Sequence, residues 1–177
     1  MIYLLVGIPL LAAGVLAALA SKQPSNYRVT RSLLIAAPPG VVFDKVNNLS
    51  RWAEWSPWEK MDPAMKKTFT GPESGDGASY SWVGNASVGE GRMTIAQSEP
   101  AKLIKIDLEF LKPFKGTSTA EFAFEDRDGQ TLVSWTGYGD LNAVTKVVSI
   151  FMSMDKCMGD QFEKGLRQLK QTAEASA

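Results

Sequence analysis

The sequence contains no histidine and a single cysteine, Cys157. The missing histidine excludes histidine-based catalytic triads, a histidine general base and histidine metal ligands. One cysteine cannot form an internal disulfide or a paired-thiol site. Lys and Arg number 19, as do Asp and Glu, so there is no basic excess and no nucleic acid is expected as a partner. What remains is a fold that binds something apolar, or an enzyme that works with carboxylates, hydroxyls and amides. No metal and no cofactor is expected.

Length and composition are those of one folded domain with an appendage. The chain has 177 residues, of which 45% are hydrophobic and 21% charged, a balance typical of globular proteins. We expect a linker over residues 21–27, a ligand-binding domain over residues 28–173 and a short tail over residues 174–177.

Charged side chains are missing altogether from residues 1–20. A helix of that length spans ~30 Å, the thickness of a bilayer core. A retained membrane anchor is the favoured interpretation, because no Lys or Arg precedes the apolar run and the run is long for a signal peptide. The alternative is a secretory signal peptide cleaved near Ala20, since Ala18-Leu19-Ala20 fits a cleavage site of small residues.

The charges after the apolar run bear on topology. Lys22, Arg28 and Arg31 come before the first acidic residue, Asp44. By the positive-inside rule, an anchored domain is then expected in the cytoplasm. Cleavage near Ala20 would instead give a secreted or periplasmic protein.

Alternating apolar and polar residues predict an antiparallel sheet. Strands are expected over residues 28–36, 65–70, 78–83, 91–98, 102–111, 117–125 and 131–138. Gly84-Asn85 and Asp128-Gly129 are typical hairpin turns. Helical spacing predicts a short helix over residues 41–49, and residues 51–59 read as a second short helix or a tight loop.

The last predicted element is a long helix over about residues 143–173. Its apolar residues recur at three- and four-residue intervals: Val144, Val147, Val148, Phe151, Met154, Met158, Phe162, Leu166 and Leu169. The predicted fold class is therefore α+β. A curved antiparallel sheet wraps around the long C-terminal helix, with two short helices and one preceding N-terminal hydrophobic helix.

Three stretches resemble the START and polyketide cyclase/dehydrase superfamily, which has the helix-grip fold. They are IAAPPGVVFDKVNNLSRWAEWSPWE (residues 35–59), WVGNASVGEGRMTI (residues 82–95) and MDKCMGDQFEKGLRQLK (residues 154–170). The resemblance extends over residues 28–173. It implies a deep apolar cavity between the sheet and the long helix. Members of the superfamily include lipid carriers, hormone receptors, quinone-binding proteins and aromatase/cyclases, and no catalytic motif common to them is carried over.

Aromatic, aliphatic and methionine side chains are the candidates to line such a cavity. The ligand-binding candidates are Trp55, Tyr80, Trp82, Ile106, Phe110, Trp135, Met154 and Met158. Methionine adapts to several ligand shapes, and tryptophan offers a large apolar face with one N–H donor. The alternative for each is ordinary core packing, which is the usual place of such residues.

Asp155 and Tyr80 are the candidates for catalysis. A carboxylate beside an apolar cavity has a raised pKa and can move protons. Alternatively, Asp155 pairs with Lys156 or Lys146 or caps a loop. Glu54 and Glu59 lie in the Trp-rich segment 51–59, and Glu59, which follows the Pro57 turn, is expected to be hydrated. Because no acid–base motif is apparent, the favoured function is binding of a hydrophobic small molecule or lipid by a membrane-anchored protein. An enzyme of the cyclase/dehydratase type and a protein-interaction module are the alternatives.

Overall fold

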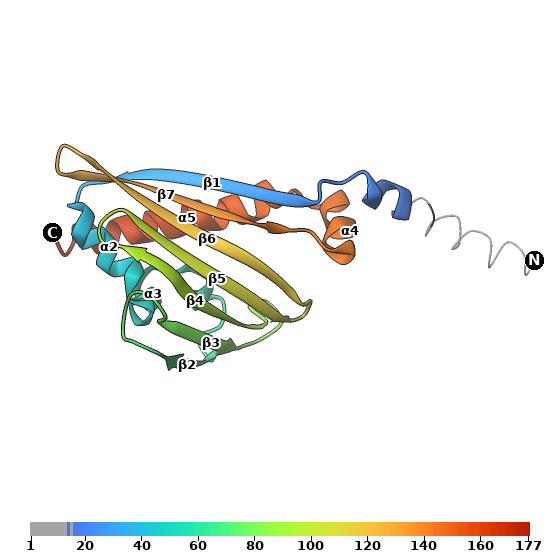
Figure 1. Cartoon of the computed structure of the whole chain (residues 1–177), viewed down its shortest axis with the longest axis horizontal. Helices are drawn as coiled ribbons and strands as arrows, with labels where there is room; N and C mark the ends of the chain where they lie inside the picture. Colours follow the sequence, from blue (N-terminus) through green and yellow to red (C-terminus); the bar gives the residue numbers. More distant parts are fainter. Residues whose placement is uncertain (1–13, 15) are drawn as a thin grey trace, which may run out of the picture.

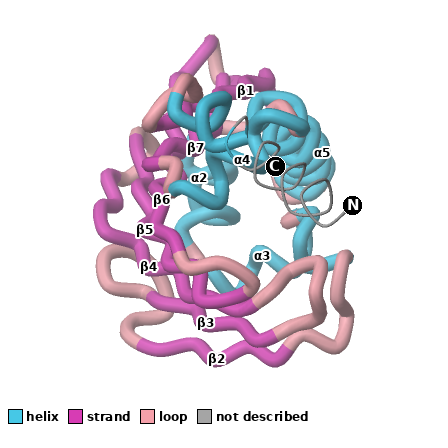
Figure 2. Tube along the Cα trace, turned by 90° about the vertical axis from the view of Figure 1, so that its right-hand side faces the viewer, coloured by secondary structure: helices cyan, strands magenta, loops and turns pink. Residues whose placement is uncertain are grey.

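The computed structural model describes residues 14 and 16–177. Its main feature is a seven-stranded antiparallel sheet in the order β1-β7-β6-β5-β4-β3-β2, curved around the helix α5 (Figures 1 and 2). The strands are β1 (Asn26–Ile35), β2 (Lys66–Thr70), β3 (Ser79–Val83), β4 (Glu90–Glu99), β5 (Leu103–Lys112), β6 (Gly116–Arg127) and β7 (Gln130–Asp140). This confirms the predicted α+β helix-grip arrangement.

The sheet has an inner face that is turned toward α5 and an outer face in contact with solvent. Ile104 and Ile106 of β5 are buried on the inner face, whereas the next residue, Asp107, is exposed on the outer face. Trp135 and Tyr138 of β7 lie on opposite faces, as their spacing predicts, because alternate residues of a strand point to opposite sides.

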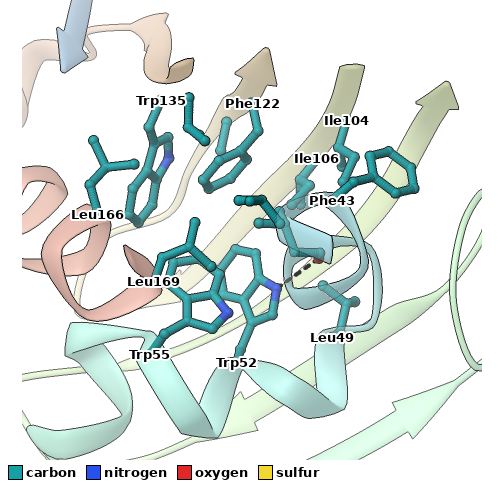
Figure 3. Close-up of a cluster of buried hydrophobic side chains, with 14 of the residues drawn as sticks. Phe43, Leu49, Trp52, Trp55, Ile104, Ile106, Phe122, Trp135, Leu166 and Leu169 are labelled. Atoms are coloured by element: carbon teal, nitrogen blue, oxygen red, sulfur yellow. Dashed lines mark hydrogen bonds between the residues drawn. The ribbon is translucent and has the colours of Figure 1, made fainter. Parts of the chain in front are cut away.

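The end of the inner face nearest the C-terminus is closed by α2 (Pro39–Asn47), α3 (Trp52–Trp55) and the second half of α5 (Met154–Glu174). Short 3-10 turns, Leu49–Arg51 and Pro57–Lys60, flank α3. The side chains packed here form the closed core, drawn in Figure 3: Phe43, Leu49, Trp52, Trp55, Ile104, Ile106, Phe122, Trp135, Leu166 and Leu169. The indole N–H groups of Trp52 and Trp55 donate to the carbonyls of Val46 and Lys45, which ties α3 to α2.

The prediction of one continuous C-terminal helix was wrong. The segment forms two helices, α4 (Ala143–Phe151) and α5 (Met154–Glu174), separated by extended backbone at Met152 and Ser153. The hydroxyl of Ser153 accepts a hydrogen bond from the Lys156 N–H and so caps the start of α5. The predicted apolar stripe is likewise divided, because its α5 residues pack against the sheet while α4 contains no buried residue.

Side chains of α5 also bond to the backbone of β1, the first edge strand. The ammonium of Lys170 donates to the carbonyl of Leu34 at 3.0 Å. The carboxylate of Glu174 accepts from the N–H of Ala36, the residue directly after β1, at 2.8 Å. In the middle of β1, Arg31 forms ion pairs with Asp155 and Glu163. The helix is thereby fixed along the edge of the sheet.

Most of the predicted anchor, residues 1–20, lies outside the described residues, which begin at residue 14. Residues 16–21 are helical. No helix in the described part of the chain is both long and apolar enough to span a membrane.

Candidate ligand-binding site

Burial of the inner face changes from one end of the molecule to the other. In the closed core, Trp55, Ile106 and Trp135 are at most 2% exposed. At the end nearest α4, apolar side chains of the sheet and of the start of α5 are only partly covered: Tyr27, Leu108 and Phe110 on the strands, and Met154 and Met158 on α5. We call this set the open inner face. The eight predicted ligand-binding residues are thus not brought together at one place, since some lie in the closed core and others at the open inner face.

Two glycines set how closely side chains approach the sheet near the open inner face. A β-carbon at position 137 would lie 2.8 Å from Cζ of Phe162 and 2.9 Å from Cε of Met158. A β-carbon at position 91 would lie 2.6 Å from the ring of Trp82. Because both positions are glycine, side chains of α5 approach the backbone of β7 and the Trp82 ring approaches the backbone of β4.

An aromatic row continues from the open inner face toward β2. Trp82 contacts Phe110 edge to face at 6.0 Å between ring centroids, and Tyr80 lies 5.9 Å from Trp82. Phe69 of β2 stacks on Tyr80 at 5.2 Å and is 49% exposed. Tyr80 and Trp82 therefore share one face of β3, as the alternation predicts, and form a wall beside the open inner face.

A polar cluster lies at the end of this aromatic row. The hydroxyl of Tyr80 donates to Oε1 of Glu59 at 3.0 Å, and the ammonium of Lys67 pairs with Oε2 of the same carboxylate. The Glu59 side chain is only 10% exposed, so the alternative that placed it in a hydrated turn was wrong. Burial and the neighbouring Glu59 carboxylate raise the pKa of Tyr80 well above its ordinary value, which keeps the phenol protonated.

Sequence reasoning did not assemble this cluster because its members come from three separate elements. Glu59 lies in the 3-10 turn Pro57–Lys60, Lys67 in β2 and Tyr80 in β3. The register of the β2–β3 hairpin pairs Lys67 with Trp82 and Phe69 with Tyr80 on the inner face. The sequence could have indicated this cluster only through the β2–β3 register, which places Lys67 and Tyr80 on one face, together with the Pro57 turn that contains Glu59.

Asp155 is placed differently from its predicted catalytic role. Its side chain is 66% exposed and binds Arg31 through both carboxylate oxygens at 3.0 Å. The hydrogen bonds from Arg31 lower the pKa of Asp155, which is the opposite of the expected direction. The alternative partners expected from the sequence, Lys156 and Lys146, were wrong, because Arg31 of β1 supplies the cation.

One donor inside the closed core has no acceptor. The indole Nε1 of Trp135 is buried and has no hydrogen-bond partner among the described residues. The ring is held between Phe162, stacked at 4.3 Å, and Phe122, stacked at 4.7 Å. On β7, Trp135 precedes Gly137 on the same face, so it stands at the boundary between the closed core and the open inner face.

Two pockets in the described structure lie elsewhere. The larger, of about 560 Å³, is lined mainly by polar side chains of the outer face, among them Arg92, Asp107, Glu109 and Tyr138. The smaller, of about 130 Å³, lies beside β2 and the loop that follows it. Residues of α5 line neither pocket. The polar lining of the larger one is unsuited to an apolar ligand.

Solved structures with the same fold come from several sources. The protein CV1439 from Chromobacterium violaceum has a TM-score of 0.60 and 15% identity, covering 86% of this chain and 99% of its own. The Zhui aromatase/cyclase from Streptomyces sp. R1128 has a TM-score of 0.62 and 15% identity, covering 84% of this chain and 94% of its own. The di-domain ARO/CYC BexL from the BE-7585A biosynthetic pathway has a TM-score of 0.64 and 17% identity, covering 89% of this chain and 53% of its own. At these identities the likeness establishes the fold alone.

Sequence comparison points to the same group. No curated protein matches the sequence closely enough to count as a relative. A family model described as "Polyketide cyclase / dehydrase and lipid transport" matches residues 27–174, nearly the whole of the domain that contains the sheet and α5. The chain belongs to this polyketide cyclase/dehydrase and lipid transport family.

Proposed function

We propose that the protein binds a hydrophobic small molecule or lipid-like ligand at the open inner face, and that residues 1–20 anchor it in a membrane. The observation that carries the proposal is the incomplete burial of Tyr27, Leu108, Phe110, Met154 and Met158 beside a fully buried core. Apolar side chains that face an interior yet stay partly exposed gain free energy when a ligand covers them. Lys22 and the two arginines after the apolar run favour a cytoplasmic domain.

The buried indole of Trp135 supports a ligand that has a hydrogen-bond acceptor. A buried donor without a partner costs roughly 1–3 kcal/mol. A carbonyl or similar oxygen on the ligand would remove that cost by accepting from Nε1. The expected ligand is therefore mainly apolar, with an oxygen near the end that enters beside Phe162 and Gly137.

Ligand extraction and a pair of substitutions test the binding proposal. The full-length protein is purified in detergent, extracted into organic solvent and analysed by mass spectrometry for a bound lipid, quinone or polyketide. Met154→Trp combined with Met158→Trp is expected to abolish binding of a fluorescent fatty acid while leaving the fold intact. Met152→Trp is the matched control, because Met152 is 52% exposed and lies outside the open inner face. Unchanged binding in the double variant would reject the placement.

A second candidate function is proton transfer at an apolar carbonyl substrate, and the Glu59–Tyr80 pair favours it. In such a step the Glu59 carboxylate removes a proton from the carbon beside the carbonyl. The Tyr80 hydroxyl donates to the enolate oxygen that forms, and the enolate carbon then attacks a second carbonyl in an aldol-type cyclisation. The proton held by Glu59 returns to the resulting alkoxide, so the step needs no added oxidant or reductant.

Hydrogen exchange separates this enzyme from a carrier. An enzyme is expected to exchange the α-protons of a β-diketone for deuterium in heavy water, measured by NMR, and Glu59→Gln is expected to abolish the exchange. Glu54→Gln is the control, because Glu54 lies in the same segment but pairs with Lys45. Exchange that is absent from the wild-type protein, or equal in Glu59→Gln, would leave binding as the function.

A further inference from the structure

The helix α4 presents an apolar face that nothing in the described structure covers. Val144, Val148 and Phe151 share this face at helical spacing, and Met152 follows directly. Phe151 is 71% exposed and Met152 is 52% exposed. An amphipathic helix normally buries such a face against its own domain, as α5 does. The apolar face of α4 is therefore left for something outside the domain.

The β5–β6 turn and the linker before β1 lie at the same end of the molecule as α4 (Figure 1). Asn142, the cap of α4, donates to the carbonyl of Lys115 in the β5–β6 turn at 3.2 Å. The ammonium of Lys146 lies 3.3 Å from the hydroxyl of Ser25 in the linker. Further exposed apolar side chains belong to the β5–β6 segment, namely Leu111 and Phe114. We call the surface formed by residues 21–25, 111–119 and 141–154 the α4 surface.

The charged residues within these three ranges are all lysines, while the exposed Asp140 and Asp155 directly flank the range 141–154, and Asp155 is paired with Arg31. The lysines of the α4 surface are Lys22, Lys112, Lys115 and Lys146. Lys112 pairs with Glu90 of the neighbouring strand at 2.7 Å. The other three lysines have no carboxylate partner among the described residues. Exposed apolar side chains interleaved with unpaired lysines suit the interface of a bilayer that contains anionic lipids.

We propose that the α4 surface lies on an anionic lipid bilayer, with α4 parallel to the membrane plane. The uncharged run of residues 1–20 ends directly at this surface, so an inserted run would bring this end of the domain, and no other, to the headgroups. The lysines then meet lipid phosphates while Phe114 and Phe151 enter the boundary of the acyl chains. A second copy of the chain would carry the same positive charge, which disfavours self-association through this surface.

This placement deepens the proposed function, on which it rests, by giving the ligand a route. The open inner face lies at the same end as α4, and Met154 is only two residues from Met152. A domain seated in this way turns its partly exposed apolar residues toward the bilayer. Apolar ligands would then pass between acyl chains and the open inner face without crossing water.

Depth-dependent fluorescence quenching tests the seating in the full-length protein. A Cys157→Ser background removes the only native thiol, and an environment-sensitive dye is attached at Phe151→Cys or Phe114→Cys. Ser176→Cys, at the opposite end of the molecule, is the control. In vesicles of phosphatidylcholine and phosphatidylglycerol that contain nitroxide lipids, the dyes at 151 and 114 are expected to be quenched and the dye at 176 is not. Vesicles without phosphatidylglycerol are expected to give weaker quenching.

Each other result overturns the proposal. If the protein floats with the vesicles but the dyes at positions 151 and 114 stay unquenched, residues 1–20 anchor the protein and α4 does not contact lipid. Cross-linking between two copies through position 151 would assign the surface to self-association. Quenching of all three positions alike would mean nonspecific adsorption.

Ligand transfer separates failure of this placement from failure of the binding function. Val148→Asp with Phe151→Asp is expected to slow transfer of a fluorescent lipid from vesicles several-fold, while binding of the same lipid from detergent solution is unchanged. Leu34→Asp is the control, because Leu34 is 42% exposed at the far end of β1. Unchanged transfer in the α4 variant would reject the route, whereas no binding from detergent in the wild-type protein would reject the proposed function itself.

Discussion

The guanidinium of Arg31 in β1 occupies the space that a side chain at position 159 of α5 would fill. Because residue 159 is glycine, Arg31 passes over the helix backbone there. It then donates to Asp155 and Glu163, each at 3.0 Å. A glycine inside a helix is unfavourable by roughly 0.8–1 kcal/mol relative to alanine, so its place here is explained by the arginine that lies against it.

Gly159→Ala is expected to disturb this ion pair without unfolding the domain. The guanidinium is the end of a flexible side chain and can move away from the new methyl group. The gain in helix propensity offsets the loss of exposed ion pairs, so the free energy of unfolding in denaturant should stay close to that of the wild-type protein. The pKa of Asp155, measured by NMR titration of its carboxyl group, is expected to rise toward its ordinary value. A pKa that stays low would show that Arg31 keeps its place.

Stability is expected to depend on pH through Asp155. Arg31 lowers the pKa of this carboxyl in the folded protein, so the stabilising contribution is present above the unfolded value and is lost as pH falls through the folded value. Asp155→Asn should therefore lower the free energy of unfolding at neutral pH, and the difference from wild type should shrink below about pH 4. Asp160→Asn, on the exposed side of the same helix, is the control for removal of a carboxylate that does not contact Arg31.

Gly165→Ala is expected to be destabilising, in contrast to Gly159→Ala. A β-carbon at 165 would lie 2.7 Å from Cζ3 of Trp135 and 3.2 Å from Cδ of Pro57. Because the Trp135 ring is held by stacking on both sides, it has nowhere to move, and overpacking of this kind costs about 1–3 kcal/mol. Gly40→Ala in α2 is the matched control, since no atom lies within 4 Å of its β-carbon position. Chemical denaturation of both variants measures the difference.

The raised pKa of Tyr80 predicts a loss of stability at alkaline pH. The folded protein keeps the phenol protonated, whereas the unfolded chain releases the proton near its ordinary pKa of 10.0. The contribution is therefore complete below about pH 10 and falls as pH rises toward the folded value. Tyr80→Phe is expected to reduce this alkaline slope in denaturation experiments, and Tyr138→Phe is the control. An equal slope in both variants would contradict the assignment.

Most of the sheet could be predicted because its signals are local. Alternation within each strand and the pair Asp128-Gly129, both at positive φ in the structure, define β6, β7 and their hairpin. The division between α4 and α5 could not be predicted from periodicity. Apolar residues recur at helical spacing on both sides of Ser153, and only the cap at Ser153 ends one helix and begins the next.

The candidate site was less predictable because it depends on contacts between distant elements. Apolar character and spacing predict Met154, Met158 and Phe110 as candidates to line a cavity, but their partial burial follows from how far α5 covers the sheet. The burial of Glu59 depends on Tyr80, which is 21 residues away. Composition alone gave no reason to expect Asp155 to pair with Arg31, since two lysines lie closer along the sequence.

The bonds between α5 and the backbone of β1 also bear on aggregation. An unpaired edge strand is a template for a strand of another molecule. Along β1, the carbonyl of Leu34 accepts a hydrogen bond from Lys170, and the carbonyl of Thr30 accepts one from Arg31. The strand at the opposite edge, β2, is short and contains two lysines. A sheet that does not close into a barrel is thus kept from extending into a neighbour by charged side chains at both of its margins.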